Sequence, residues 1–314
     1  MSTLLLTHAS GLDHEMGQGH PERPDRIRTI EQILANEDFS ALVRDEAPQG
    51  RESDILRAHP KSHFDSIQDN IPQQGYTFLD GDTVMCPESW QAILHAVGAG
   101  TEAVDRVMSG EVNNAFCALR PPGHHAEKER AMGFCFFNNI AVAAYYAREK
   151  YNLDRVAIID FDVHHGNGTQ DILWNEPDMF YGSTHEMPLY PGTGAKHETG
   201  AGNIFNAPLP NHCDSDTFRE TMQEQILQPL KKFGPEFIFI SAGFDAHRLD
   251  PLSTTELIEA DFDWVTRKLM EVSDTTAGGR IVSMLEGGYD LQGLSQSVAV
   301  HVKALMEAGT GSGS

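Results

Sequence analysis

Residues 160–169, Asp-Phe-Asp-Val-His-His-Gly-Asn-Gly-Thr, bring carboxylates, imidazoles and glycines together directly after the mostly apolar run 155–159. Such a run is typical of a strand buried in a parallel sheet. If the strand continues through its last residues, side chains two apart share a face, so Asp160, Asp162 and His164 point the same way. A carboxylate beside an imidazole supplies two of the three protein ligands of an open catalytic zinc site. The spacing therefore predicts metal-assisted chemistry.

Three further polar clusters also follow predicted strands. They are 120–126 after 114–119, 242–247 after 237–241, and 286–290 after 280–285. Loops at the carboxyl ends of parallel strands converge at one edge of an open sheet, where such folds bind ligands. We therefore expect one site built from four loops, in which Asp245 supplies the third metal ligand.

Predicted strands and helices alternate along the chain. Strands are expected at 4–7, 114–119, 155–160, 179–183, 237–241 and 280–285. Helices are expected at 24–36, 88–108, 138–150, 216–232, 255–273 and 294–308. Strands separated by helices of this length indicate βαβ crossovers and a mainly parallel sheet with helices on both faces. The fold class is therefore α/β.

The 314-residue chain is expected to form a single domain over 1–308, because no linker or internal repeat divides it. Residues 309–314, Gly-Thr-Gly-Ser-Gly-Ser, are expected to form a flexible tail. The sequence has no apolar run long enough to span a membrane, so we expect no membrane partner. Residues 1–7 do not resemble a signal peptide, so we expect a cytoplasmic protein. The four cysteines show no close pairing, which favours buried free thiols.

The charge balance is strongly acidic, with 23 Lys and Arg against 46 Asp and Glu and a net charge of −23. Such a surface repels nucleic acid, so DNA and RNA are excluded as partners. It would attract cationic substrates such as polyamines or lysine-rich peptides. Adaptation to high salt explains the same composition, and the sequence alone leaves both explanations open.

Six segments in order resemble the histone deacetylase family, which includes the bacterial acetylpolyamine amidohydrolases. They are RPPGHHA at 120–126, GFCFFNN at 133–139, DFDVHHGNGTQ at 160–170, YPGTG at 190–194, AGFDAH at 242–247 and EGGYDL at 286–291. GHPERPDRI at 19–27 is similar to the N-terminal motif of the class II branch. The resemblance covers nearly the whole chain. It implies the arginase/deacetylase fold, a roughly eight-stranded, mainly parallel sheet, in a class II-like bacterial type.

The resemblance also assigns roles for amide hydrolysis. It implies zinc on Asp162, His164 and Asp245, with Fe²⁺ as an alternative occupant. The remaining catalytic roles are a general base at His125, an electrostatic partner at His124, an oxyanion donor at Tyr289, and orienting groups at Asp160 for His124 and Asn167 for His125. The family's structural potassium site matches the Asp160 carboxylate, the Ser183 hydroxyl and backbone carbonyls that include that of Thr184.

The substrate-binding residues are assigned in the same way. Phe134 and Tyr190 match the walls of the tunnel that holds the acyl-lysine stem, and Gly133 matches the carbonyl beneath it. Leu252 falls at the rim, where a polyamine-specific relative would carry a carboxylate, so a lysine-like substrate is favoured.

The expected activity is removal of acetyl from N-acetyl-lysine in a protein or peptide. Hydrolysis of acetylated polyamines stays open as the alternative, and so does the oligomeric state. A non-catalytic acetyl-lysine reader is disfavoured because Tyr289 is present. An arginase-like two-metal hydrolase is disfavoured because the loops supply ligands for a single metal.

Overall fold

The computed structural model describes residues 2–307, so the tail expected at 309–314 lies outside the described residues. Its centre is an eight-stranded sheet in the order β2-β1-β5-β10-β9-β6-β7-β8. Every neighbouring pair in this sheet is parallel, which confirms the α/β class. The strands are β1 Thr3–Thr7, β2 Val43–Glu46, β5 Asn114–Cys117, β6 Val156–Asp160, β7 Met179–Glu186, β8 Ile204–Leu209, β9 Phe237–Ala242 and β10 Ile281–Leu285.

The central strands are mainly apolar because both faces of the sheet are covered. In β6, Val156 and Ile158 belong to one hydrophobic cluster, while Ala157 and Ile159 belong to the other. Successive side chains of a strand point to opposite faces, so an unbroken apolar run fills two cores at once.

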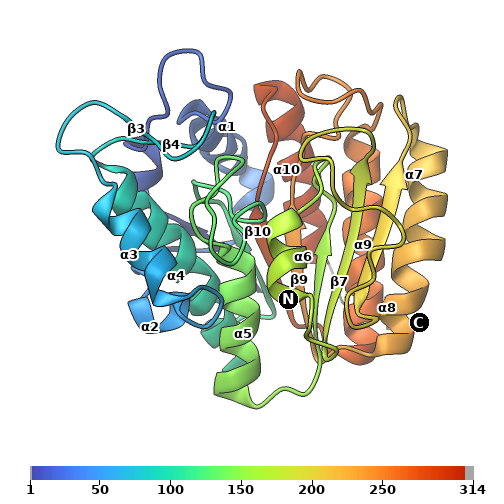
Figure 1. Ribbon diagram of the computed structural model, residues 1–314. Helices are drawn as coiled ribbons and strands as arrows, with labels where there is room; N and C mark the ends of the chain where they lie inside the picture. The colour runs from blue at the N-terminus through green and yellow to red at the C-terminus, as the bar shows by residue number, and fades with distance from the viewer. Residues whose placement is uncertain (1, 308–314) are drawn as a thin grey trace.

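Helices cover the two faces as separate layers (Figure 1). The first layer packs on one cluster and contains α2 Glu52–Ile55, α3 Lys61–Asp69, α4 Ser89–Met108, α5 Asn139–Tyr151 and α6 Asn167–Leu173. The second packs on the other and contains α1 Asp25–Leu34, α7 Ser215–Thr221, α8 Gln228–Phe233, α9 Glu259–Thr276 and α10 Leu291–Glu307. Within residues 2–307, none of these helices has the length and apolar character needed to span a bilayer.

The structure differs from several expected elements, although helix runs through 215–233, close to the expected 216–232. The helix expected at 216–232 contains a wider π-helical stretch, Met222–Leu227, just before Pro229, which has no N–H for an ordinary helical hydrogen bond. The helix expected from 255 begins at Glu259, because Thr255 donates its hydroxyl to the Ala246 carbonyl instead. The edge strands β2 and β8 and a small hairpin, β3 Thr77–Phe78 with β4 Val84–Met85, were missed.

The strand order explains why the four polar clusters meet. They follow β5, β10, β9 and β6, which are consecutive neighbours in the sheet. Because these strands are parallel, their carboxyl ends lie at the same edge, and the loops that leave them form one site.

Candidate active site

Asp162 and His164 follow β6, Asp245 follows β9, and their side chains converge. His164 Nδ1 lies 3.1 Å from Asp162 Oδ1 and 3.1 Å from Asp245 Oδ2. One N–H cannot serve both carboxylates well, whereas three zinc ligands at about 2.0–2.1 Å from a tetrahedral ion lie roughly 3.3 Å apart. Within residues 2–307, this is the one group of three such side chains whose geometry could hold a metal. The donor set and its spacing fit a zinc ion.

Backbone N–H groups hold the two carboxylates in place. Val163 donates to Asp245 Oδ1 at 2.9 Å, and Gly287 donates to Asp162 Oδ2 at 2.8 Å. A Cβ atom at Gly287 would lie 2.0 Å from Asp245 Oδ2, so a glycine is needed where the loop after β10 crosses the ligands. A Cβ atom at Gly243 would likewise lie 2.0 Å from Asp162 Oδ2.

The electrostatics of this cluster favour a cation. Both carboxylates are fully buried, and burial raises the pKa of Asp245, with the charge of Asp162 adding to the effect. Burial would also raise the pKa of Asp162, but the neighbouring imidazoles of His124 and His164 hold it far below its usual range. Two buried carboxylates this close need a positive partner.

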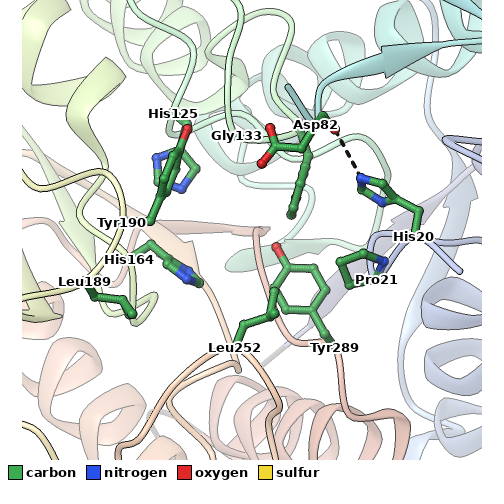
Figure 2. Close-up of a pocket in the computed structure, with 11 residues that line it drawn as sticks. His20, Pro21, Asp82, His125, Gly133, His164, Leu189, Tyr190, Leu252 and Tyr289 are labelled. Atoms are coloured by element: carbon green, nitrogen blue, oxygen red, sulfur yellow. Dashed lines mark hydrogen bonds between the residues drawn. The ribbon is translucent and has the colours of Figure 1, made fainter. Parts of the chain in front are cut away.

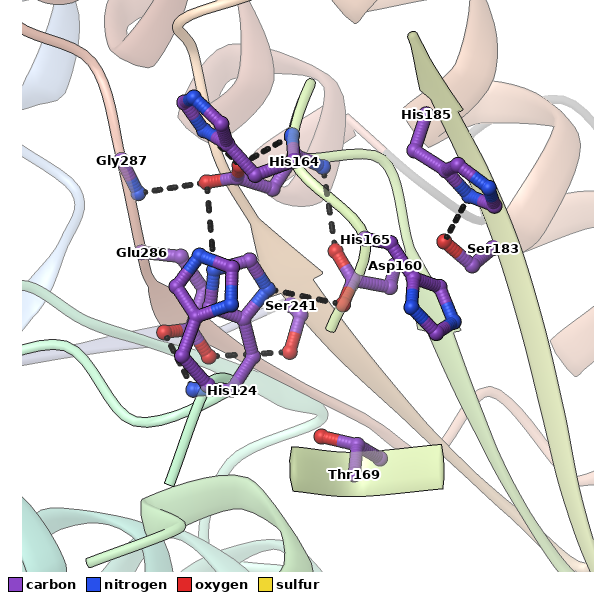
Figure 3. A network of polar contacts seen from close by, with 12 residues as sticks. His124, Asp160, His164, His165, Thr169, Ser183, His185, Ser241, Glu286 and Gly287 are labelled. Carbon is purple, nitrogen blue, oxygen red and sulfur yellow. Dashed lines mark hydrogen bonds and ion pairs between the residues drawn. The ribbon is translucent and has the colours of Figure 1, made fainter. Parts of the chain in front are cut away.

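The paired histidines, His124 and His125, lie in the loop after β5. His124 Nδ1 is 3.0 Å from Asp160 Oδ2, and His125 Nδ1 is 2.8 Å from Asn167 Oδ1. The two rings have centroids 4.0 Å apart, and His124 Nε2 lies 3.9 Å from Asp162 Oδ2. Figure 3 shows the contact that links His124 to Asp160.

The two histidines differ in charge because their partners differ. Burial alone would lower the pKa of His124, but the carboxylates of Asp160, Asp162 and Glu286 raise it well above its usual range. Burial, with the nearby imidazoles of His124 and His164, holds the pKa of His125 well below its usual range. His125 is therefore the neutral imidazole of the pair and the one able to accept a proton.

Tyr289 follows β10 after two glycines, and its hydroxyl points into a pocket across from His125 and His164 (Figure 2). Burial raises its pKa well above the usual range, so the phenol keeps its proton. The loop can take this shape because residue 288 is a glycine. Its φ of +122° is a backbone conformation that glycine adopts readily and other residues rarely adopt.

The pocket has a volume of about 400 Å³, and the sequence-predicted substrate residues line it. Phe134 and Tyr190 form walls, Gly133 lies against the His125 ring, and Leu252 is on the side of Tyr289. His20 and Asp82 also line it. His20 Nε2 lies 3.1 Å from the Asp82 carbonyl, which joins the N-terminal motif to the β3–β4 hairpin.

Asp160, Ser183 and Thr184, expected around potassium, are buried beside the catalytic loops. Asp160 and Ser183 are register partners on β6 and β7. His185 Nε2 is 2.9 Å from the Gly194 carbonyl, and its Nδ1 is 2.9 Å from Ser183 Oγ. Because a carbonyl only accepts, Nε2 carries the proton and the Ser183 hydroxyl donates to Nδ1. Lone pairs on Ser183 Oγ therefore stay available, as oxygen ligation of a cation requires.

Sequence reasoning missed a buried ionic network that supports the Tyr289 loop. Arg26 donates to the carbonyls of Glu286 and Gly288 at 2.5 and 2.7 Å, and to Glu22 at 3.0 Å. Glu22 also accepts from Arg120, and all three charged side chains are fully buried. Glu22 and Arg26 belong to the GHPERPDRI segment, which resembles a family motif. The sequence did not reveal that this segment contacts the Tyr289 loop.

Glu286 and Asp250 were missed as well. Glu286 accepts from the backbone of Gly123 at 2.7 Å and of His124 at 3.1 Å, and from the Ser241 hydroxyl at 2.9 Å. It thereby ties the paired-histidine loop to β9 and β10. Burial raises its pKa to about 7. Glu286 begins the polar cluster at 286–290, which showed that the loop matters without giving this acid a role, and no sequence signal distinguished Asp250 from the many acids on the surface.

Comparison with known proteins agrees with this geometry. The family model for the histone deacetylase domain matches residues 20–305. The chain is 37% identical to histone deacetylase 10, chloroplastic, of Oryza sativa subsp. japonica, over 92% of this chain and 70% of that protein. It is 35% identical to the histone deacetylase-like amidohydrolase of Pseudomonas aeruginosa, over 86% of this chain and 73% of that one.

A solved structure has the same fold. The crystal structure of the HDA15 HD domain superimposes with a TM-score of 0.91 at 34% identity, covering 97% of this chain and 89% of that one. A family match over most of the chain, relatives above 30% identity and a shared fold lead to one conclusion. The chain belongs to the histone deacetylase family.

Proposed function

We propose that this protein is a zinc-dependent deacetylase that hydrolyses the acetyl group from the ε-amine of N-acetyl-lysine in proteins or peptides. One observation carries the proposal. His164 of the Asp162, His164 and Asp245 cluster lines the same pocket as His125 and Tyr289, and the aromatic side chains of Phe134 and Tyr190 line it too. The membership of the chain in a deacetylase family supports hydrolysis of an acylated amine.

The three ligands are two carboxylates and one imidazole, which suit zinc and would also accept Fe²⁺. When bound, the ion supplies Lewis acidity, which polarises an amide carbonyl and makes water a stronger acid. A single cluster supports one metal per chain rather than an arginase-like pair.

The chain's own residues then divide the chemistry. His125 accepts the proton of the attacking water, because it is the neutral member of the pair, and later gives a proton to the departing amine. His124, held by Asp160, supplies positive charge beside it. The Tyr289 hydroxyl donates a hydrogen bond to the oxyanion that forms from the carbonyl, a contact worth roughly 3–4 kcal/mol.

Phe134 and Tyr190 enclose the methylene stem of the acyl-lysine and exclude water from the reacting amide. We assign Asp160, Ser183 and Thr184 to a structural potassium ion, because hard oxygen donors lie together next to the catalytic loops. We place the protein in a reducing compartment such as the cytoplasm, because Cys86, Cys117, Cys135 and Cys213 are all free and buried.

An acetylated polyamine is the second candidate substrate, favoured by one observation. The Asp82 carboxylate lines the pocket of a chain whose net charge is −23, where it would attract a distant ammonium group. Leu252 on the same pocket wall favours an acetyl-lysine side chain instead.

Parallel assays of acetyl-lysine peptides, acetylputrescine, acetylcadaverine and acetylspermidine with the zinc-loaded protein test the proposal. We expect the highest kcat/KM on an acetyl-lysine peptide. Preference for the polyamines would transfer the assignment to the second candidate. Binding without turnover of any of them would make the protein a reader.

A further inference from the structure

Asn167 connects His125 to a carboxylate that the catalytic scheme above does not use. Its Oδ1 lies 2.8 Å from His125 Nδ1, and its Nδ2 donates to Glu127 Oε1 at 2.7 Å. The side chain of Met132 contributes only a sulfur, 3.3 Å from the same Nδ2. Asn167 is 4% exposed, so water does not compete freely for its amide. The three polar residues form a chain that ends on the charge of Glu127.

The chemistry of these partners fixes the direction of every hydrogen bond. A carboxylate only accepts, so the NH₂ group of Asn167 must face Glu127 and its carbonyl oxygen must face His125. That oxygen also only accepts, so His125 Nδ1 carries the proton. Nε2 is then the unprotonated nitrogen of a ring that lines the pocket. The opposite amide orientation would place the Asn167 amide oxygen 2.7 Å from Glu127 Oε1. It would also place the Asn167 NH₂ group against the protonated His125 Nδ1.

The backbone holds these residues in register. Thr169 N–H donates to the His124 carbonyl at 3.1 Å, and Lys128 N–H donates to Asp171 Oδ2 at 2.9 Å. A Cβ atom at Gly168 would lie 2.2 Å from the Ala126 carbonyl oxygen, so the two segments are in direct contact. Glu127 itself begins a tight turn, with its N–H donating to the Arg130 carbonyl at 2.9 Å.

We propose that Glu127 is a positioning residue that fixes the amide orientation of Asn167 and, through it, the tautomer of His125. The effect on catalysis rests on the proposed function, whereas the effect on the tautomer does not. An aspartate at position 167 would place a negative charge directly on the imidazole. Here that charge lies one hydrogen bond further away, on Glu127.

The decisive change is Glu127→Lys. An ammonium group only donates, so it would attract Asn167 Oδ1 and turn the NH₂ group toward His125. His125 Nδ1 must then lose its proton to Nε2, which removes the acceptor from the pocket side. Adding Asn167→Asp restores an acceptor for both neighbours, so the Glu127→Lys, Asn167→Asp double variant should recover the original tautomer.

The tautomer is read by long-range ¹H–¹⁵N correlation spectra of the zinc-loaded, ¹⁵N-histidine-labelled protein. The His125 signals are assigned from their loss in His125→Gln. We expect a protonated Nδ1 in the wild type and in the double variant, and a protonated Nε2 in Glu127→Lys. Glu129→Lys makes the same charge change two residues along the same exposed turn and should leave the spectrum unchanged.

Activity gives a second reading on acetyl-lysine peptide. Glu127→Lys should lower kcat by about 100-fold, in the range of general-base effects, and leave KM within about twofold. The double variant should recover most of this loss. Glu127→Gln keeps an acceptor oxygen for Asn167, so it should lose no more than about fivefold.

An unchanged His125 tautomer in Glu127→Lys would overturn the proposal, and so would a double variant no better than the single one. If Glu127→Lys fails to fold, Glu127→Gln decides. A 100-fold loss of kcat in Glu127→Gln would exclude a role based on amide orientation, because Gln still offers Asn167 an acceptor oxygen. A wild-type protein inactive on every acetylated amine would contradict the proposed function. The spectra would still decide the role of Glu127.

Discussion

Asp250 Oδ2 accepts a hydrogen bond from the backbone N–H of Tyr289 at 2.6 Å. The same oxygen accepts from Asp290 at 3.2 Å, and Oδ1 accepts from Leu252 at 3.0 Å. One buried carboxylate thus joins the loop after β9, which carries the proposed metal ligand Asp245, to the loop after β10, which carries the proposed oxyanion donor. Burial, with the charge of Asp245 adding to it, raises the pKa of Asp250 to about 7.

The first prediction concerns this contact. Asp250→Asn should lower kcat at least tenfold with little change in KM, because a neutral amide holds the two N–H groups less firmly. If the effect passes through Tyr289, adding Asp250→Asn to Tyr289→Phe should cost almost nothing more, which steady-state kinetics of the four proteins will show. Asp263→Asn, which alters only an outer pair with Arg267, should behave like the wild type. Fully additive losses would contradict a shared role.

Tyr289→Phe removes a single hydroxyl. We expect kcat to fall about 100-fold or more, as for the loss of one oxyanion donor, while zinc content and thermal stability stay nearly unchanged. Rapid-quench measurement of one turnover would place the loss in the chemical step. Near-normal turnover would remove Tyr289 from the proposed mechanism.

The metal site should hold one equivalent of zinc per chain. Removing zinc with a chelator should abolish activity, and Zn²⁺, Fe²⁺ or Co²⁺ should restore it. Gly287→Ala should weaken zinc retention, because the added Cβ would lie 2.0 Å from Asp245 Oδ2 and would displace that oxygen. Gly81→Ala, where a Cβ meets nothing within 4 Å, is the matched control. Two equivalents of metal would support an arginase-like site instead.

Acid should selectively weaken the buried network around Glu22. Burial would raise the pKa of Glu22, but Arg120 and Arg26 lower it from 4.5 to about 2. Since the folded pKa lies below the unfolded one, this stabilisation is present above pH ~4.5 and disappears as the pH falls toward 2. The shift corresponds to roughly 3 kcal/mol.

Urea unfolding of wild type and Glu22→Gln from pH 7 to pH 2 checks this expectation. The difference in unfolding free energy between the two proteins should shrink as the pH falls from about 4.5 toward 2, because Glu22 becomes protonated there. The titration of the other acids is common to both proteins and cancels in the difference. For the exposed Glu37→Gln, the difference should stay near zero throughout. A Glu22→Gln difference independent of pH would contradict the assigned pKa.

Salt tests whether the acidic surface steers substrate. If it does, kcat/KM for a multiply charged acetylpolyamine should fall steeply between about 0.05 and 0.5 M salt, while that for a neutral acetyl-lysine analogue changes little. Asp82→Asn should flatten the polyamine response, because Asp82 lines the pocket. Equal responses of both substrates would leave solubility as the role of the charge.

Local sequence determined the central strands and the residues that leave them. The run that ends in Asp160 is apolar on both faces, so it forms a buried parallel strand, and the Asp-x-His spacing after it puts Asp162 and His164 on one side. The edge strands β2 and β8 escaped prediction because an edge strand does not need an unbroken apolar run. β2 reads Val-Arg-Asp-Glu, and β8 contains Pro208.

Tertiary structure alone decided which acids hold the loops of the site in place. Glu286 begins the EGGYDL segment and Glu127 directly follows RPPGHHA, but neither segment reveals what these carboxylates contact, and nothing near Asp250 distinguishes it from the other carboxylates of a very acidic chain. Their partners, Gly123, Asn167 and Tyr289, lie 163, 40 and 39 residues away along the chain. A hydrogen bond depends on separation in space, and strand order brings these loops together. The sequence therefore determined the groups proposed to do the chemistry, and the fold determined the groups that hold them in place.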